Sequence, residues 1–278
     1  MRMTRLTTWI GILTVAALLA TPAAATTQTY MLTDAWGGTW ADAEKSPANN
    51  QDDLMCWAGA AANVLEWTGW GKTAGMTNAD EMFTYFQDHW TDAGGNMAYG
   101  WDWWFDGTNE TQGVSGWSQV DVPGGGFYPT VNFGDYFHYD GTNAEADALA
   151  DIDPYLRSGY GVGLAIVVET SSGLSGHAVT CWRFDYNDAL APTDPGYYTG
   201  IWITDSDDDK YDSTPEDELR HYGLTWTSGA WHLENYFGDY RIVEVQGLDQ
   251  RPVPEPITMA GLTIGVGSLV RYVRRRCG

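Results

Sequence analysis

The hydrophobic spacing of the chain changes along its length from a helical to a strand-like pattern. In the earlier part, apolar residues recur at the three- and four-residue intervals of amphipathic helices. The predicted helices are Leu54–Trp67, Ala79–Trp90 and Asn143–Arg157, with a loop-like stretch from Gly94 to Gly126 between the last two. Later, short segments alternate or run apolar, as strands do. The predicted strands are Gly161–Val168, His177–Phe184, Gly200–Thr204 and Tyr240–Gln246. This order predicts an α+β domain.

The charge of the chain excludes one class of partner. Its 278 residues include 37 acidic and 14 basic side chains, which gives a formal net charge of −23. A surface this acidic repels phosphate backbones, so we expect no nucleic-acid partner. Hydrophobic residues make up 44% of the chain, which is enough for a sizeable core.

The first 25 residues have the pattern of a signal peptide. Arg2 and Arg5 precede an apolar run from Leu6 to Ala20, and small residues at Ala23–Ala25 offer a cleavage site. We therefore expect an exported chain whose single domain covers residues 26–250.

The last segment, residues 251–278, predicts a sorting tail. Pro254-Glu255-Pro256 precedes the apolar run Ile257–Val270 and an arginine cluster over residues 271–276. This run of about 14 residues is shorter than the roughly 17–25 that a spanning helix needs. The three parts together resemble the PEP-CTERM sorting signal. That resemblance implies handling by an exosortase-type membrane enzyme, transient membrane contact through the apolar helix, and an extracellular or cell-surface product. A plain C-terminal anchor is the alternative.

Cys56 is the first candidate for chemistry. The chain has three cysteines, Cys56, Cys181 and Cys277, which cannot form a disulfide framework. Asp52 or Asp53 can cap the predicted helix, which places Cys56 in its first turn. Amide N–H groups and the helix dipole favour a thiolate there. The other reading is a buried core cysteine, which is a common environment for this residue.

His177 is the second candidate. It follows a turn rich in Gly and Ser over residues 171–176 and opens a predicted strand. That position suits a general base that projects into a cleft, although a histidine can equally be a plain surface or core residue. By strand alternation Cys181 shares a face with His177, and we expect Cys181 to pack beneath the site.

A run of carboxylates after the strand Gly200–Thr204 is the third candidate, and three interpretations stay open. Asp205 could orient an imidazole, as the third member of a catalytic triad does. Asp205, Asp207, Asp209 and Glu216 could instead bind calcium, although Lys210 stands where a calcium loop has glycine. The third interpretation is a solvated acidic turn.

The order of Cys56, His177 and Asp205 along the chain fits a cysteine peptidase of papain-like layout. The residues around them resemble the secreted immunoglobulin-degrading cysteine endopeptidases, the IdeS/Mac family. Three blocks within residues 40–210 carry this resemblance: Asp52–Cys56, Gly176–Asp185 and Trp202–Asp208.

The resemblance implies a papain-like α+β fold, with a helical first half, the nucleophile at a helix N-terminus and an antiparallel sheet in the second half. It implies that Cys56 is the nucleophile, that His177 is the general base, that Asp205 orients the imidazole and that Asp207 supports the site. A protein or peptide is then the substrate, and no metal or cofactor takes part.

Two positions near Cys56 depart from the family pattern. The family has a lysine ten residues before its cysteine that helps to bind the oxyanion, and Lys45 lies eleven before Cys56. Asn50 and Gln51 are rival oxyanion donors. Trp57 stands where the family usually has glycine, so its indole could narrow the cleft.

A different class of function rests on the aromatic residues. Trp101, Trp103, Trp104 and Phe105 could offer sugar-stacking faces, which would make the chain a carbohydrate-binding module. A non-catalytic surface or biofilm protein that retains a peptidase-like fold is the other alternative.

Overall fold

The computed structural model describes residues 26–31, 40–46, 51–73, 75–108, 113–141, 144–208 and 217–252. The predicted signal peptide lies outside these residues, as does the sorting tail apart from Arg251 and Pro252. Within the described ranges, no helix has both the length and the apolar character required to cross a membrane.

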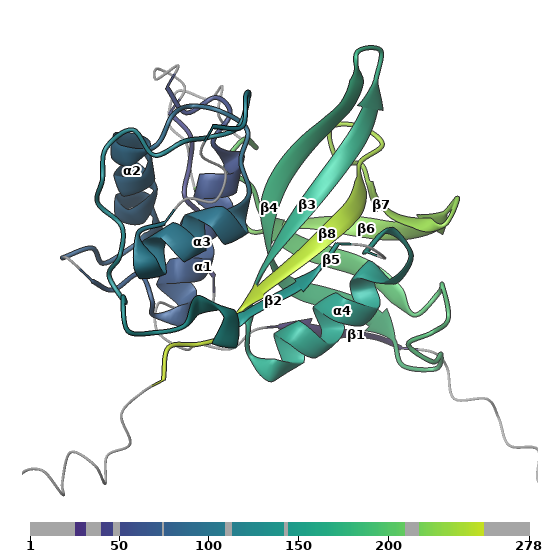
Figure 1. The fold of residues 1–278 in the computed structure, drawn as a ribbon. Coiled ribbons are helices and arrows are strands. Elements are labelled where there is room, and N and C mark those ends of the chain that lie inside the picture. Colours follow the sequence, from purple (N-terminus) through teal and green to yellow (C-terminus); the bar gives the residue numbers. More distant parts are fainter. Residues whose placement is uncertain are drawn as a thin grey trace, which may run out of the picture.

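Six antiparallel strands form a closed barrel in the second half of the chain. They are β3 (Gly161–Thr170), β4 (Gly173–Asn187), β5 (Tyr198–Thr204), β6 (Arg220–Thr227), β7 (Ala230–Glu234) and β8 (Arg241–Leu248). Neighbours pair in the order β4-β3-β8-β7-β6-β5, and β5 pairs back with β4 to close the ring. The strands β3 and β4 continue beyond the barrel as a long hairpin (Figure 1).

Two further strands lie outside the ring. β1 (Thr27–Met31) pairs with the end of β4, and β2 (Phe137–Asp140) pairs with β8. A short 3-10 helix, η1 (Phe133–Asp135), leads into β2.

Four α-helices complete the described fold: α1 (Cys56–Thr68), α2 (Ala79–His89), α3 (Met97–Asp106) and α4 (Ala144–Ser158). The first three lie together on one side of the strands, and α4 packs separately on β8, β7 and β3 (Figure 1). α1 contacts both α2 and α3 and also the barrel strands β3 and β4, so it joins the helical layer to the barrel.

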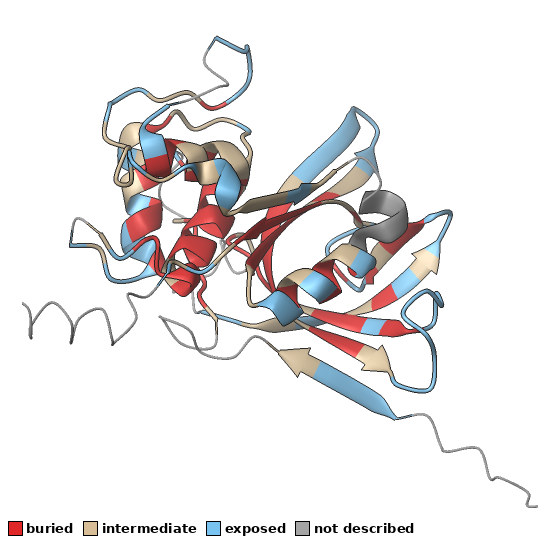
Figure 2. Cartoon of the chain, turned by 60° about the horizontal axis from the view of Figure 1, so that its bottom comes forward, coloured by how far each residue is buried: buried red, intermediate tan, exposed pale blue. Residues whose placement is uncertain are grey.

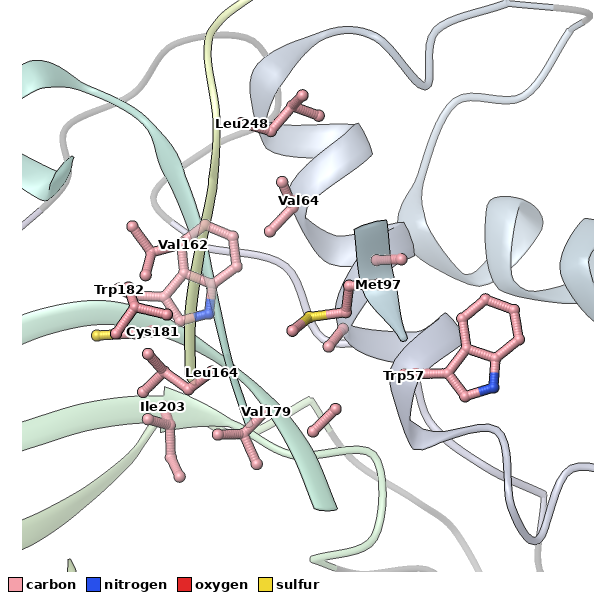
Figure 3. Close-up of a cluster of buried hydrophobic side chains, with 14 of the residues drawn as sticks. Trp57, Val64, Met97, Val162, Leu164, Val179, Cys181, Trp182, Ile203 and Leu248 are labelled. Carbon is pink, nitrogen blue, oxygen red and sulfur yellow. The ribbon is translucent and has the colours of Figure 1, made fainter. Parts of the chain in front are cut away.

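The core runs without a break from the helices into the barrel. Nearly every residue of α1 is buried, as are the inward-facing residues of the strands (Figure 2). Leu164, Val179 and Ile203 fill the barrel side of this core, and Met97 of α3 reaches toward it (Figure 3). Burial of such side chains is the main source of stability in a domain of this kind.

The predicted papain-like α+β fold is wrong. The described chain has a closed six-stranded antiparallel barrel with extra strands and four short helices, which is a mostly β fold. Closure depends on β5 pairing with β4, where Thr204 lies opposite Thr180. Such a pairing joins distant residues, so the local periodicity from which the α+β class was predicted does not contain it.

Most predicted elements are present with shifted ends. The helices α1, α2 and α4 and the strands β3, β4, β5 and β8 match predicted segments. The predicted loop Gly94–Gly126, however, contains α3. That helix contains Gly100 and lies in a stretch rich in Gly, Trp and Asn, a composition that is typical of a loop and concealed it in the sequence. The short strands β1, β2, β6 and β7 were also not predicted.

Candidate active site

Cys56 is the first residue of α1, and its side chain is half-buried. Neither Asp52 nor Asp53 caps this helix as expected, because the N-cap position is Met55 and no side chain caps it. Burial alone would raise the pKa of the Cys56 thiol. The charge of His177 and a hydrogen bond from it, with a smaller contribution from Lys45, outweigh burial and hold that pKa below its ordinary value.

The side chain of Asp52 does not cap α1, but it holds the backbone segment that precedes Cys56 in place. This fully buried carboxylate accepts a hydrogen bond of 2.8 Å from the Ser46 N–H and one of 3.0 Å from the Gln87 side chain. Leu54 N–H in turn donates to Asp92 at 2.7 Å. The turn that precedes Cys56 is therefore bonded to the segment of Ser46, to α2 and to the loop after α2.

His177 lies within β4 rather than at its start, because the strand begins at Gly173, before the expected turn has ended. Its Nε2 is 2.5 Å from Oδ1 of Asp205. Because this contact occupies Nε2, the other ring nitrogen is the one that can bond to the Cys56 thiol. Burial alone would lower the pKa of His177, but the charges of Asp205 and Cys56 raise it well above its usual value. The pair thus favours a thiolate facing an imidazolium.

Asp205 follows directly after β5 and is almost completely buried. Oδ1 accepts from His177 and, at 3.1 Å, from the backbone N–H of Asp207. Oδ2 accepts from the hydroxyl of Tyr236. Burial would raise the pKa of this carboxyl, but His177 and these hydrogen bonds hold it below its usual value. Asp205 is therefore a carboxylate that fixes the orientation of the imidazole.

Lys45 connects the segment before Cys56 to the segment after β5. Its side chain is 1% exposed, its Nζ lies 2.8 Å from Oδ1 of Asp207, and it donates to the Asp53 carbonyl at 3.0 Å. Its backbone N–H donates to the Ser206 carbonyl at 3.1 Å. Oδ2 of Asp207 lies 3.8 Å from Nδ1 of His177.

All five side chains singled out in the sequence thus meet at one place: Cys56, His177, Asp205, Asp207 and Lys45. Of the rival oxyanion donors, Asn50 lies outside the described residues and Gln51 is exposed in the turn ahead of α1. The Cys56 N–H is a further donor, because the first N–H groups of a helix have no acceptor within it.

Only some of the possible calcium ligands lie within the described residues. Asp209, Lys210 and Glu216 lie outside the described residues. Within the described ones, no group of three His, Cys, Asp or Glu side chains is arranged to hold a metal ion. Asp205 and Asp207 face His177 and Lys45 instead.

Cys181 and Trp57 both lie in the core. Cys181 is fully buried in the barrel among Val162, Leu164 and Ile203, and burial raises the pKa of its thiol to about 12 (Figure 3). It packs in the core, paired in the sheet with Val162 and Ile203. Trp57 does not line the nucleophile, because it is buried against Phe86 and Trp90 and its indole N–H donates to the Ala93 carbonyl.

The aromatic cluster of α3 is core. Trp101, Trp103, Trp104 and Phe105 are all 0–1% exposed. Their rings have no face open to solvent, which argues against sugar stacking at this cluster. A cavity of about 610 Å³ lies elsewhere, between α4 and the strands β5, β6 and β7, and none of its lining residues belongs to the site around Cys56.

Sequence reasoning missed two residues of this region, Tyr236 and Asn63. Tyr236 lies in the connection between β7 and β8, and no local pattern marks it. Asn63 did carry a signal, since it is the one amide side chain in the otherwise small and apolar segment Ala58–Leu65. A polar residue at such a position is expected to have a buried hydrogen-bonding partner.

No protein-family model matches the chain, and no curated protein is significantly similar to it. The chemistry of the chain is therefore inferred from the arrangement of side chains around Cys56.

Proposed function

We propose that the chain is a secreted cysteine endopeptidase that hydrolyses peptide bonds of an extracellular protein. One observation carries this proposal: contacts run from Asp205 through His177 to the Cys56 thiol, whose pKa is lowered. The three sequence blocks that resemble the IdeS/Mac family support it. The fold itself does not, because an architecture does not specify an activity.

In the proposed reaction, the Cys56 thiolate attacks the scissile carbonyl carbon. The Cys56 N–H and the Lys45 ammonium stabilise the negative charge that develops on the carbonyl oxygen. Protonated His177 gives its proton to the leaving amine, and a thioester remains on Cys56. His177 then takes a proton from water, and the resulting hydroxide hydrolyses the thioester and releases Cys56.

Asp205 and Asp207 act through their neighbours in this scheme. Asp205 keeps the imidazole in one orientation and stabilises its protonated form. Asp207 holds Lys45 close to the site. The terminal segments direct the proposed localisation: the signal peptide directs export, and the tail is recognised by an exosortase-type enzyme at the membrane.

Replacing the thiol tests the proposal. We expect Cys56→Ala to lower the hydrolysis of a fluorogenic peptide library, or of casein, by at least about 10³-fold, as loss of a nucleophile does in triad enzymes. Its thermal unfolding should stay close to that of the wild type, because the half-buried thiol contributes little packing.

Cys181→Ala is the matched control, because it removes the other described thiol. It should keep the activity while losing stability, since Cys181 is fully buried. Hydrolysis by Cys56→Ala at the wild-type rate would overturn the proposal. The proposal would also be overturned if iodoacetamide alkylated Cys56 of the wild type only when the pH approaches the ordinary pKa of a thiol.

A further inference from the structure

Asn63 occupies a position on α1 that faces the barrel. It comes seven residues after Cys56, which is about two helical turns, so both side chains lie on one face of the helix about 10 Å apart along its axis. Its side chain is 1% exposed. A buried amide at this point must satisfy its polar atoms within the protein.

The amide does so through three hydrogen bonds that all leave the helix. Oδ1 accepts from the Ala43 N–H at 2.8 Å. Nδ2 donates to the Thr180 hydroxyl at 3.2 Å and to the Thr204 hydroxyl at 3.3 Å. One side chain of α1 is thus bonded to three separate segments of the chain.

Each of these segments carries a residue of the proposed site. Ala43 precedes Lys45 by two residues, Thr180 follows His177 by three on β4, and Thr204 directly precedes Asp205. Asn63 itself shares the rigid helix α1 with Cys56. The four parts of the site therefore meet at a single amide beneath them.

The partners of Asn63 are themselves held in place. The Thr204 hydroxyl also accepts from the indole N–H of Trp182 at 2.9 Å and donates to the Ala41 carbonyl at 2.9 Å. The Thr180 hydroxyl lies 3.5 Å from the Ala60 carbonyl on α1. A fully bonded network of this kind has one arrangement, because a shift of any member leaves a buried polar group unpaired.

Apolar contacts cannot define this arrangement as sharply. α1 also packs on the barrel through side chains such as Val64, which lies against Gly161. Hydrophobic contact is non-directional, whereas hydrogen bonds depend steeply on distance and angle. We propose that Asn63 is a positioning residue: its amide sets the register of α1 against β4 and β5 and so keeps the Cys56 thiol facing His177. This inference rests on the proposed function only for its activity readout.

The test compares variants inside and outside this network. Asn63→Asp keeps the acceptor for Ala43 but loses both N–H donors of Nδ2, and Thr180→Val removes one of their acceptors without introducing a charge. Thr68→Val is the matched control. Like Thr180, Thr68 is fully buried, but it lies on α1, and within the described part of the chain its hydroxyl bonds to carbonyls of its own helix.

Two readouts separate positioning from stability. The pH dependence of iodoacetamide labelling, followed by mass spectrometry of the peptide that contains Cys56, reports the thiol and needs no substrate. We expect its midpoint to rise in Asn63→Asp and in Thr180→Val and to stay unchanged in Thr68→Val. We expect kcat to fall about tenfold or more in Asn63→Asp, with KM little changed, since small misplacements of reacting groups are costly.

A wild-type midpoint and wild-type kcat in folded Asn63→Asp would overturn the inference. If that variant does not fold, Thr180→Val decides in the same way. A wild type that cleaves no peptide, with a midpoint that still moves in the variants, would refute the proposed function and leave the positioning role standing. If the wild type cleaves peptides but the labelling midpoint does not move in the variants, the proposed function stands and the positioning role of Asn63 is refuted.

Discussion

Asp205 depends on the groups around its two oxygens. Buried carboxylates are costly unless several donors surround them, and here His177, Tyr236 and the Asp207 N–H supply the hydrogen bonds. Tyr236 is the most distant of these in sequence, and its ring packs among Tyr222, Phe237 and Tyr240. It gives the carboxylate a hydrogen bond that does not involve the imidazole.

Tyr236→Phe should weaken the site without disturbing the packing of the ring. We expect it to lower the free energy of unfolding by about 1.5–3 kcal/mol at neutral pH, the usual range for a hydrogen bond to a charged group. It should also lower kcat, because Asp205 would hold the imidazole less firmly. Urea unfolding and peptide hydrolysis measure the two effects. Tyr240→Phe loses the same atom from a neighbouring ring and should show neither.

The loss of stability in Tyr236→Phe should depend on pH in a defined direction. The folded-state pKa of Asp205 lies below its ordinary value of 3.8, so its stabilisation is present above that value and is lost as the pH falls through the folded-state pKa. Removing the Tyr236 hydroxyl brings the folded-state pKa back toward 3.8. The stability gap between the wild type and Tyr236→Phe should therefore be full above about pH 5 and narrow at lower pH. A gap that widens on acidification would contradict this account.

At the scale of elements, α1 can approach the barrel closely because its side chains are small. A Cβ at Gly59 would lie 3.1 Å from the Cβ of Ser206 and 3.4 Å from the Ala43 carbonyl oxygen. Ser206 lies between Asp205 and Asp207, and its carbonyl accepts from the Lys45 N–H. The absence of a side chain at Gly59 is what lets the helix and the carboxylate segment touch.

Gly59→Val should force these two elements apart. A branched side chain there overpacks the contact, which typically costs about 1–3 kcal/mol, although valine is a better helix former than glycine. We expect lower stability and a higher pH midpoint for Cys56 labelling, because Asp205 and Lys45 would move with Ser206. The checks are thermal unfolding and labelling against pH.

Gly176→Ala provides the comparison for that variant. It adds a methyl group one residue before His177, where the new Cβ would meet only Val167, at 4.0 Å. It should leave the labelling midpoint unchanged. If both substitutions behaved alike, close packing at Gly59 would not be what positions the site.

Whether an element was predicted from the sequence depended on how clearly its residues show a local pattern. α1, α2 and β3 have clear apolar patterns, and their existence was predicted correctly. α3 was not, because it contains Gly100 and lies in a stretch rich in Gly, Trp and Asn, a composition that is typical of a loop. Short strands such as β6 and β7 take their conformation from pairing with each other rather than from their own residues.

At the scale of the whole molecule, the site forms where the helical layer meets the barrel. Cys56 comes from the helices, whereas His177 lies on β4 and Asp205 directly follows β5, the strand that pairs with β4. Neither part contains the complete site. Its integrity therefore depends on how the two layers dock, and Asn63 and Gly59 both lie at that contact.

The proposed export gives a prediction for the whole chain. Expressed in a host with a matching sorting system, the protein should be recovered outside the cell or at its surface, with an N-terminus near Thr26 and without the arginine cluster of the tail. N-terminal sequencing and intact mass measure both cuts. Replacing the Pro254-Glu255-Pro256 motif with alanines should leave the first cut and block the second. Loss of the tail in that variant would argue against a PEP-CTERM signal.

The sequence, with the family resemblance of its three blocks, singled out five candidate residues that the fold places together: Cys56, His177, Asp205, Asp207 and Lys45. It could do so because residue type and local motif carry reactivity, whatever the surrounding architecture. Only the tertiary structure decided that the strands close into a barrel, that α3 is a helix, and that Tyr236 and Asn63 contact the site or its supports. Those outcomes depend on contacts between residues far apart in the chain, and a local pattern does not encode which distant partner completes a hydrogen bond or a sheet.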